Sequence, residues 1–282
     1  MLIVKPLYAE NESGWYMSAS ANLNYSVYSR SENQDTQTEL SFFTDADYLE
    51  NYGFAVGLID QNREQKSLGN IADSILFLGG RYHFYPETLP GKLTISLEAY
   101  KQNDLLEIIS PAVLFLNYKK TFYAALGYTQ SDYDSTFPGS GNLKVKQWAP
   151  AIGFSFNDQY DWLQLRYYNI ALSNDARNPG ITKTSAGELK LTHWIKKKEG
   201  SRLDNIQIIL LAGERLYAVD PDARKIFNFA DVQTAAYSVG GNWKLSSKNE
   251  FYIFAGMEEY KEAFLNESYS NVFVFSGYKI SW

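Results

Sequence analysis

The chain has 282 residues, a formal net charge of −6, no cysteine and two histidines, and aromatic residues make up 16% of it. The lack of cysteine excludes disulfides and thiolate chemistry. The two histidines nearly exclude a dense histidine metal site, and the acidic balance argues against nucleic acid as a partner. No run of eighteen apolar residues occurs, so the sequence predicts no transmembrane helix.

The N-terminal segment, residues 1–12, begins with the short apolar stretch MLIVKPLYA. The sequence allows two interpretations of this segment. In the first, the apolar stretch is the remnant of a secretory signal peptide cut after Ala9, although Leu7 fits poorly three positions before such a cut. Alternatively, the segment is a disordered N-terminus. Both readings place the folded domain at residues 13–282.

Period-two alternation runs through residues 13–282, and helical periodicity is almost absent. In one example, Leu93, Ile95 and Leu97 point to one side and Ser96 and Glu98 to the other. This pattern predicts an all-β fold of about 14 strands, with 12–16 possible. The predicted ranges are 14–28, 38–48, 52–60, 72–85, 91–101, 108–118, 121–130, 143–156, 159–171, 183–195, 203–217, 231–245, 249–260 and 270–282. An even number suits a closed up-and-down barrel with both termini at one end.

The connections between these strands alternate in length. The short set is 49–51, 86–90, 119–120, 157–159, 196–202 and 246–248. The long set is 29–37, 61–71, 130–143, 173–182, 218–230 and 261–270, with the short link 102–107 as an exception. Tight turns at one end and longer loops at the other are typical of a bacterial outer-membrane barrel. They predict a single antiparallel up-and-down transmembrane β-barrel.

The two faces of the predicted strands differ in charge. The expected lipid face, for example Ile95, Leu126 and Ile152, carries no charge. A charged side chain there would cost about 2–4 kcal/mol near the midplane of the bilayer. The expected pore-lining face carries the charged residues Arg81, Glu98, Arg166, Glu188, Lys190, Arg215, Lys244 and Glu258. Two aromatic girdles are predicted from Trp15, Tyr48, Tyr52, Tyr82, Tyr118, Tyr128, Trp148, Trp162 and Trp243.

Two stretches, 206–211 and 272–275, are apolar on both faces, so their inward side chains need something to pack on. An inward-folded loop would provide it. The candidates are 130–143 and 218–230, and the second carries Ile226, Phe227 and Phe229, which is unusually apolar for a loop in water.

A soluble all-β protein, either a sandwich or a periplasmic carbohydrate-binding module, would show the same alternation with its faces exchanged. Three features favour the membrane barrel over this alternative. They are the rhythm of long and short connections, the aromatic abundance and the last seven residues, SGYKISW.

These seven residues resemble the C-terminal assembly signal of Gram-negative outer-membrane β-barrel proteins. The matching positions are Ser276, Gly277, Tyr278, Ile280 and Trp282. The resemblance implies export, recognition by the barrel-assembly machinery, and a place in the cell outer membrane among its lipid and lipopolysaccharide. It covers the architecture and identifies no subfamily.

The motifs of the known barrel enzymes do not fit. The barrel phospholipases and lipid A deacylases need a His-x-Ser pair, which neither His83 nor His193 begins. Omptin-like proteases add an Asp-x-His dyad to an Asp pair. Asp45 and Asp47 exist, but Leu191 stands where the second aspartate belongs. We therefore expect no enzyme activity, no catalytic residue and no cofactor.

A metal site is not expected either. Paired loop carboxylates, Asp220 with Asp222 and Asp132 with Asp134, could bind Ca²⁺ or bridge to lipopolysaccharide. The plainer reading makes them solvated turn residues.

Fourteen strands about 4.8 Å apart and tilted about 40° enclose a backbone diameter of about 28 Å and a bore of about 15 Å. Water, an infolded loop, a partner chain or a plug must occupy it. The sequence favours a porin-like channel for passive passage of small solutes, with mixed charges giving weak selectivity. The alternative is a non-conducting barrel that serves as an export or interaction scaffold for a surface polysaccharide or a secretion partner. A soluble binding protein is a third reading.

Overall fold

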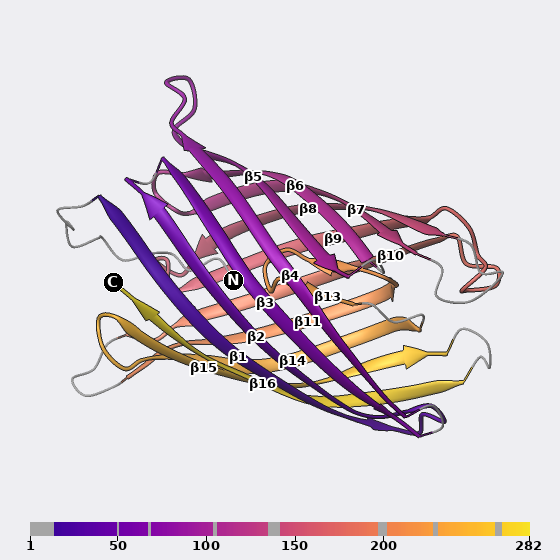
Figure 1. The fold of residues 1–282 in the computed structure, drawn as a ribbon. Coiled ribbons are helices and arrows are strands. Elements are labelled where there is room, and N and C mark those ends of the chain that lie inside the picture. The colour runs from indigo at the N-terminus through magenta and orange to yellow at the C-terminus, as the bar shows by residue number, and fades with distance from the viewer. Residues whose placement is uncertain are drawn as a thin grey trace.

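A computed structural model describes residues 14–49, 51–66, 69–103, 106–134, 142–196, 202–227, 231–262 and 267–282. Segment 1–12, with its two predicted readings, lies outside the described residues. Fourteen antiparallel strands form one closed barrel, and two short strands form a separate hairpin (Figure 1). The prediction of an all-β, 14-stranded, up-and-down barrel is confirmed. Among the described residues, no helix is long and apolar enough to cross a membrane.

The wall strands follow one another in chain order around the barrel. They are β1 (Trp15–Ser29), β2 (Gln34–Tyr48), β3 (Tyr52–Gln65), β4 (Gly69–Phe84), β5 (Gly91–Gln102), β6 (Leu106–Asn117), β7 (Phe122–Tyr133), β8 (Leu143–Phe156), β9 (Asp161–Leu172), β10 (Lys183–Trp194), β11 (Leu203–Arg215), β14 (Val232–Lys244), β15 (Asn249–Lys261) and β16 (Ser268–Ser281). The separate hairpin consists of β12 (Val219–Asp220) and β13 (Lys225–Ile226).

The last strand closes the barrel by pairing with the first. β16 runs antiparallel to β1 from Ser18 opposite Ser281 to Ser29 opposite Ser270. The backbones of Met17 and Trp282 exchange two N–H···O hydrogen bonds, each 3.0 Å long. The main chain is therefore paired through Trp282, and this seam has no open strand edge.

The two ends of the barrel differ as the connections predicted. We call the end with the tight turns the turn end; both the first and the last strand have their termini there. The opposite end, the loop end, carries connections such as 134–142, 173–182 and 216–231. Two of the predicted long loops, 29–37 and 61–71, are shorter than predicted, because β2 already begins at Gln34 and the pairing of β3 with β4 continues to Gln65 opposite Gly69.

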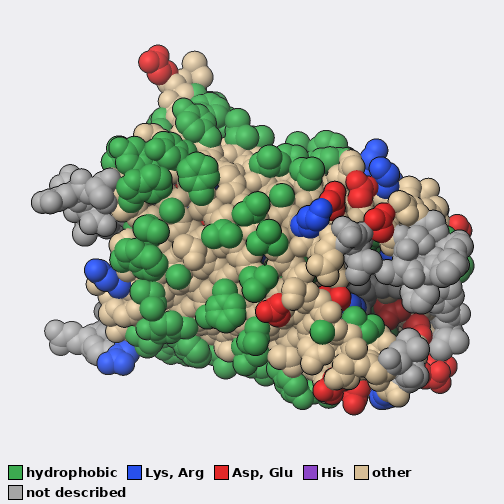
Figure 2. Space-filling view, viewed as in Figure 1, with side chains coloured by type: hydrophobic (Ala, Val, Ile, Leu, Met, Phe, Trp, Pro, Cys, Tyr) green, Lys and Arg blue, Asp and Glu red, His purple; other side chains and the backbone are tan. Residues whose placement is uncertain are grey.

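The reason for this error is visible in β3 and β4. An ion pair of 2.5 Å joins Arg63 to Asp73 across the two strands, and Ser74 donates a hydrogen bond to Asp60. Residues that are polar on both faces can remain in a strand where the barrel wall extends into water instead of hydrocarbon. Figure 2 shows most of the charged side chains of this face toward the loop end and a few at the opposite edge, while hydrophobic side chains are spread over the wall between them.

The outer face is apolar, as predicted. Phe54 and Leu97 are more than half exposed, and Ile95, Leu126 and Ile152 are nearly so. Trp15 packs against Tyr48, with ring centroids 5.0 Å apart, as expected of an aromatic girdle at the turn end. Trp162 was wrongly assigned to a girdle. It points inward, is buried, and stacks on Tyr123, because it lies one residue out of phase with the outward positions of β9.

Candidate functional site

The connection between β11 and β14 folds into the barrel. Its described part, Leu216–Phe227, contains β12 and β13, and we call it the internal hairpin (Figure 1). Val219 pairs with Ile226 and Asp220 with Lys225, and the Phe227 N–H donates to the Ala218 carbonyl at 2.8 Å. The prediction that residues 218–230 hold an infolded loop is confirmed for this described part. The other candidate, 130–143, lies partly outside the described residues.

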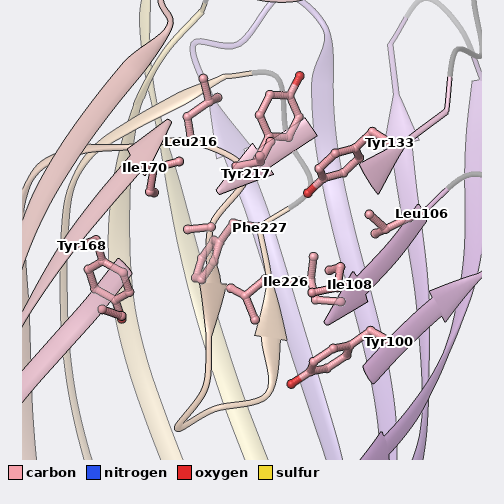
Figure 3. Close-up of a cluster of buried hydrophobic side chains, with 14 of the residues drawn as sticks. Tyr100, Leu106, Ile108, Tyr133, Tyr168, Ile170, Leu216, Tyr217, Ile226 and Phe227 are labelled. Carbon is pink, nitrogen blue, oxygen red and sulfur yellow. The ribbon is translucent and has the colours of Figure 1, made fainter. Parts of the chain in front are cut away.

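The root of the internal hairpin is apolar and packs on the inner face of the wall. Leu216, Tyr217, Ile226 and Phe227 are buried (Figure 3). They belong to one hydrophobic cluster with side chains of β2 to β11 and of β14. The wall members labelled in Figure 3 are Tyr100, Leu106, Ile108, Tyr133, Tyr168 and Ile170. Burial of these side chains stabilises the inward conformation of the hairpin.

The same cluster explains a stretch that is apolar on both faces. In β11, Ile206, Ile208 and Leu210 are exposed on the outside, whereas Leu211 is buried in the cluster. An inward apolar residue would be misplaced in a water-filled pore. Here it has the internal hairpin to pack on, as the sequence predicted.

One side of the hairpin tip is held by cations of β9 and β10. Arg166 contacts Asp222 at 2.7 Å and Asp220 at 3.4 Å, and Lys190 lies 3.5 Å from Asp222. The Gln164 amide donates a hydrogen bond of 2.9 Å to Asp222. Nearly all of Arg166 is buried, so these pairs lie in a low-dielectric setting where removing one partner is costly.

The other side of the tip is held by a cation of the hairpin itself. Arg224 donates two hydrogen bonds to the Asp45 carboxylate of β2, at 2.8 and 3.1 Å. Its guanidinium also lies 4.7 Å from the ring centroid of Phe77 and 5.1 Å from that of Phe43. A bidentate ion pair combined with ring contacts fixes the orientation of this side chain.

Three further contacts fasten the hairpin. The Gln147 side chain bonds both the N–H and the carbonyl of Val219, at 3.1 and 2.7 Å. The Arg215 guanidinium lies 3.8 Å from the ring centroid of Phe227 and 5.2 Å from that of Tyr168. Lys225 lies 3.5 Å from Glu258 on β15. The internal hairpin is therefore tied to strands on several sides of the barrel.

The eight residues predicted to line a pore all lie at inward positions of the wall. Arg166, Lys190 and Glu258 pair with the hairpin tip, and Glu98 lies 3.9 Å from Arg224. The others bond within or beside the wall: Arg81 to Asp45 and Asp47, Lys244 to Asp204, Glu188 to Tyr168, and Arg215 to Gln233. Their role in lining a pore remains a prediction.

Sequence reasoning missed the roles of Asp220, Asp222 and Arg224. The reading of Asp220 and Asp222 as solvated turn residues is wrong, because they form ion pairs with Arg166 and Lys190 inside the barrel. The signal was present in the sequence, since apolar Ile226 and Phe227 follow the charges closely. In the described part of the chain, no group of three or more metal-ligating side chains occurs.

Charge inside the barrel shifts the titration of the hairpin tip. Burial raises the pKa of the Asp222 carboxyl, but the nearby charges of Arg166 and Lys190 outweigh burial and hold that pKa well below its usual range. Asp222 is therefore ionised at neutral pH, which its ion pairs require.

No protein-family model matches the chain, and no curated protein matches its sequence. Solved structures match its fold. A CymD monoaromatic hydrocarbon channel shares 12% identity, with a TM-score of 0.54 over 96% of this chain and 89% of that one. A TodX mutant monoaromatic hydrocarbon channel shares 9%, with a TM-score of 0.56 over 95% and 90%. A bacterial polysaccharide outer-membrane secretin shares 9%, with a TM-score of 0.55 over 97% and 100%. At such identities the likeness concerns the fold alone, which is that of an outer-membrane β-barrel.

Proposed function

We propose that this protein is an outer-membrane channel for passive passage of small solutes, in which the internal hairpin narrows the lumen. The observation that carries the proposal is the combination of an apolar exterior with an interior that also holds many polar and charged side chains around an inserted hairpin. A barrel of 14 strands is too wide for its own side chains to fill, unlike one of 8. The hairpin supplies part of the missing volume, and the proposed route for solutes runs beside it.

The placement in the membrane follows from the same proposal. The turn end faces the periplasm and the loop end faces the outside, where lipopolysaccharide surrounds the wall. The segment Ser276–Trp282 acts as the signal for the barrel-assembly machinery. Membrane fractionation, together with heat-modifiable migration on a denaturing gel, tests the location, because folded outer-membrane barrels resist cold SDS. A protein that stays in the aqueous supernatant without detergent contradicts it.

Single-channel recording in planar bilayers tests the channel. The informative variant replaces Asp220–Lys225 with a short Gly-Ser linker, which removes the hairpin tip and keeps its root. We expect a severalfold larger conductance than in the unaltered protein, because the bore widens toward about 15 Å. The control places the same linker in the turn 246–248 at the turn end and should conduct like the unaltered protein.

The second candidate is a non-conducting scaffold for export or interaction. The ion pairs that anchor the hairpin on opposite sides of the lumen favour it. A linker variant that is folded, as judged by strand content and SDS resistance, yet gives no conductance steps would overturn the channel and leave this candidate.

A further inference from the structure

Two lysines lie close together on the outer face of the wall, at the loop end. Lys146 of β8 and Lys183 of β10 are both opposite Ala171 of β9 in the strand register. All three residues are exposed. Because neighbouring strands are about 4.8 Å apart, the backbones of the two lysines are about 10 Å apart. Both flexible side chains therefore have the open space over the small Ala171 within reach.

The charges of these two lysines are not compensated within the described part of the chain. The neighbouring Lys144 lies 3.6 Å from Asp132, whereas neither Lys146 nor Lys183 forms an ion pair there. The exposed Glu214 of β11 lies on the other side of β10 and forms no ion pair with Lys183 either. The two ammonium groups are therefore available to an anion from outside the protein.

An aromatic girdle fixes the depth of the two lysines in the membrane. Trp148 lies two residues from Lys146 toward the turn end and is half exposed, and its ring centroid is 4.8 Å from that of Tyr128. From Trp148 to Phe156, eight residue steps of a strand tilted about 40° cover about 20 Å of depth, close to the height of about 25 Å of an apolar band. Trp148 thus marks the upper border of that band. The lysines lie just above it, at the level of lipid headgroups.

Uncharged groups continue this surface toward the hydrocarbon. In the row of Trp148, the outward positions of β9 and β10 carry Asn169 and Ser185. In the next row toward the turn end, Gly187 lies opposite Tyr167, and a Cβ at Gly187 would meet nothing within 4 Å. The amide and hydroxyl groups suit a sugar headgroup, and the open space at Gly187 suits an acyl chain below it.

We propose that Lys146 and Lys183 bind a phosphate group of lipid A, the phosphorylated glucosamine lipid that anchors lipopolysaccharide in the outer leaflet. This inference rests on the proposed placement of the loop end at that leaflet, and it does not require the lumen to conduct. A phosphate above Ala171 accepts charge-assisted hydrogen bonds from both ammonium groups. A phospholipid of the periplasmic leaflet carries its phosphate at the turn end, far from these lysines.

Native mass spectrometry of the folded full-length protein, released from micelles of an uncharged detergent, tests the site. The probe is lipid A with both phosphates, and the comparison lipid is phosphatidylglycerol. We expect lipid A to bind more tightly. Lys146→Gln and Lys183→Gln should each weaken its binding about fivefold, the equivalent of one lysine at an anionic headgroup. Ala171→Asp should abolish the preference, because a carboxylate then lies between the two ammonium groups. Lys146→Arg keeps the charge and should retain the binding.

The matched controls are Lys119→Gln and Lys248→Gln, which remove exposed lysines at the turn end and should change nothing. Inorganic phosphate, added as a competitor, distinguishes a lipid site from a site for free phosphate. Three results overturn the proposal: equal binding of the two lipids, equal weakening by the controls, or displacement of lipid A by inorganic phosphate.

Conductance is recorded separately on the same preparations. Lipid A binding without conductance would refute the channel and keep the lipid site, whereas conductance without a preference for lipid A would refute the lipid site alone.

Discussion

At the scale of single residues, the tip of the internal hairpin is governed by a few compensated charges. Asp222 faces Arg166 and Lys190, and Arg224 faces Asp45. Each of these groups would be costly to bury alone, and each is stable inside the barrel because a partner on the wall is in reach. The hairpin is therefore specified by matched charges as well as by apolar packing.

The first prediction concerns the pH dependence of this tip. The pKa of Asp222 is lower inside the barrel than in an opened hairpin. The ionised Asp222 therefore stabilises the closed hairpin fully above the ordinary carboxyl pKa of about 4. This stabilisation is lost as the pH falls through the lower pKa that Asp222 has inside the barrel. We expect the tip to loosen in strong acid. Asp222→Asn should loosen it already at pH 7, by about 1–3 kcal/mol for the lost charge-assisted bonds.

A nitroxide label on Ala223→Cys reports this motion, since the chain has no other cysteine and Ala223 is exposed at the tip. The spectrum should sharpen in acid and, in the Asp222→Asn background, at neutral pH. Lys144→Ala, which alters an exposed ion pair with Asp132 at the loop end, is the control. An unchanged spectrum in Asp222→Asn would contradict the role of the ion pairs.

At the scale of elements, the internal hairpin behaves as a separate small unit inside the wall. Its two strands pair only with each other, and its root is held by side-chain packing. A weakened root should therefore open the hairpin while the wall stays intact, because the wall is held by its own ladder of backbone bonds.

The second prediction concerns the substitution Phe227→Ala. Truncation of a buried phenylalanine costs roughly 3–5 kcal/mol. At this position we expect the loss to reduce the free energy that favours the closed hairpin over the open one. Trypsin should then cleave after Arg224 or Lys225, which lie inside the barrel in the intact protein. The barrel should still migrate as a folded species in cold SDS. Phe154→Ala on the outer face should leave the protein resistant, and equal cleavage in both variants would argue against a local opening.

The strands were largely predictable, because alternation, turn residues and the uncharged lipid face all depend on neighbours in sequence. The prediction failed where the environment changes along one strand. Polar residues of β3 beyond Asp60 were assigned to a loop, yet they continue as strand at the loop end. The apolar Ile226 and Phe227 correctly indicated an infolded loop. The pairing of Asp222 with Arg166 could not be predicted, since it joins residues 56 positions apart.

At the scale of the whole molecule, the wall depends on a seam between the first and last strands. Gly277 of β16 lies at this seam, opposite Asn22 of β1 and Tyr252 of β15. A Cβ at Gly277 would come within 2.4 Å of atoms of both side chains. The hydroxyl of Tyr252 also donates a hydrogen bond to the Asn22 amide oxygen across this position.

The third prediction concerns the substitution Gly277→Val. Overpacking of this kind costs about 1–3 kcal/mol, so refolding from urea into detergent micelles should give less SDS-resistant barrel. Gly187→Val is the matched control, because a Cβ there meets nothing within 4 Å. Refolding without cellular machinery separates the steric effect from reading of the C-terminal signal. Equal yields of the two variants would show that the seam tolerates the added side chain.

The internal hairpin also determines how the molecule responds to an electric field. Its described residues carry two acidic groups, Asp220 and Asp222, and two basic groups, Arg224 and Lys225, so its formal charges sum to zero. A transmembrane voltage does work of about 2.3 kcal/mol per elementary charge and per 100 mV on a body that crosses the membrane. On a body without net charge it does no such work, so voltage alone gives the hairpin no preferred direction of travel.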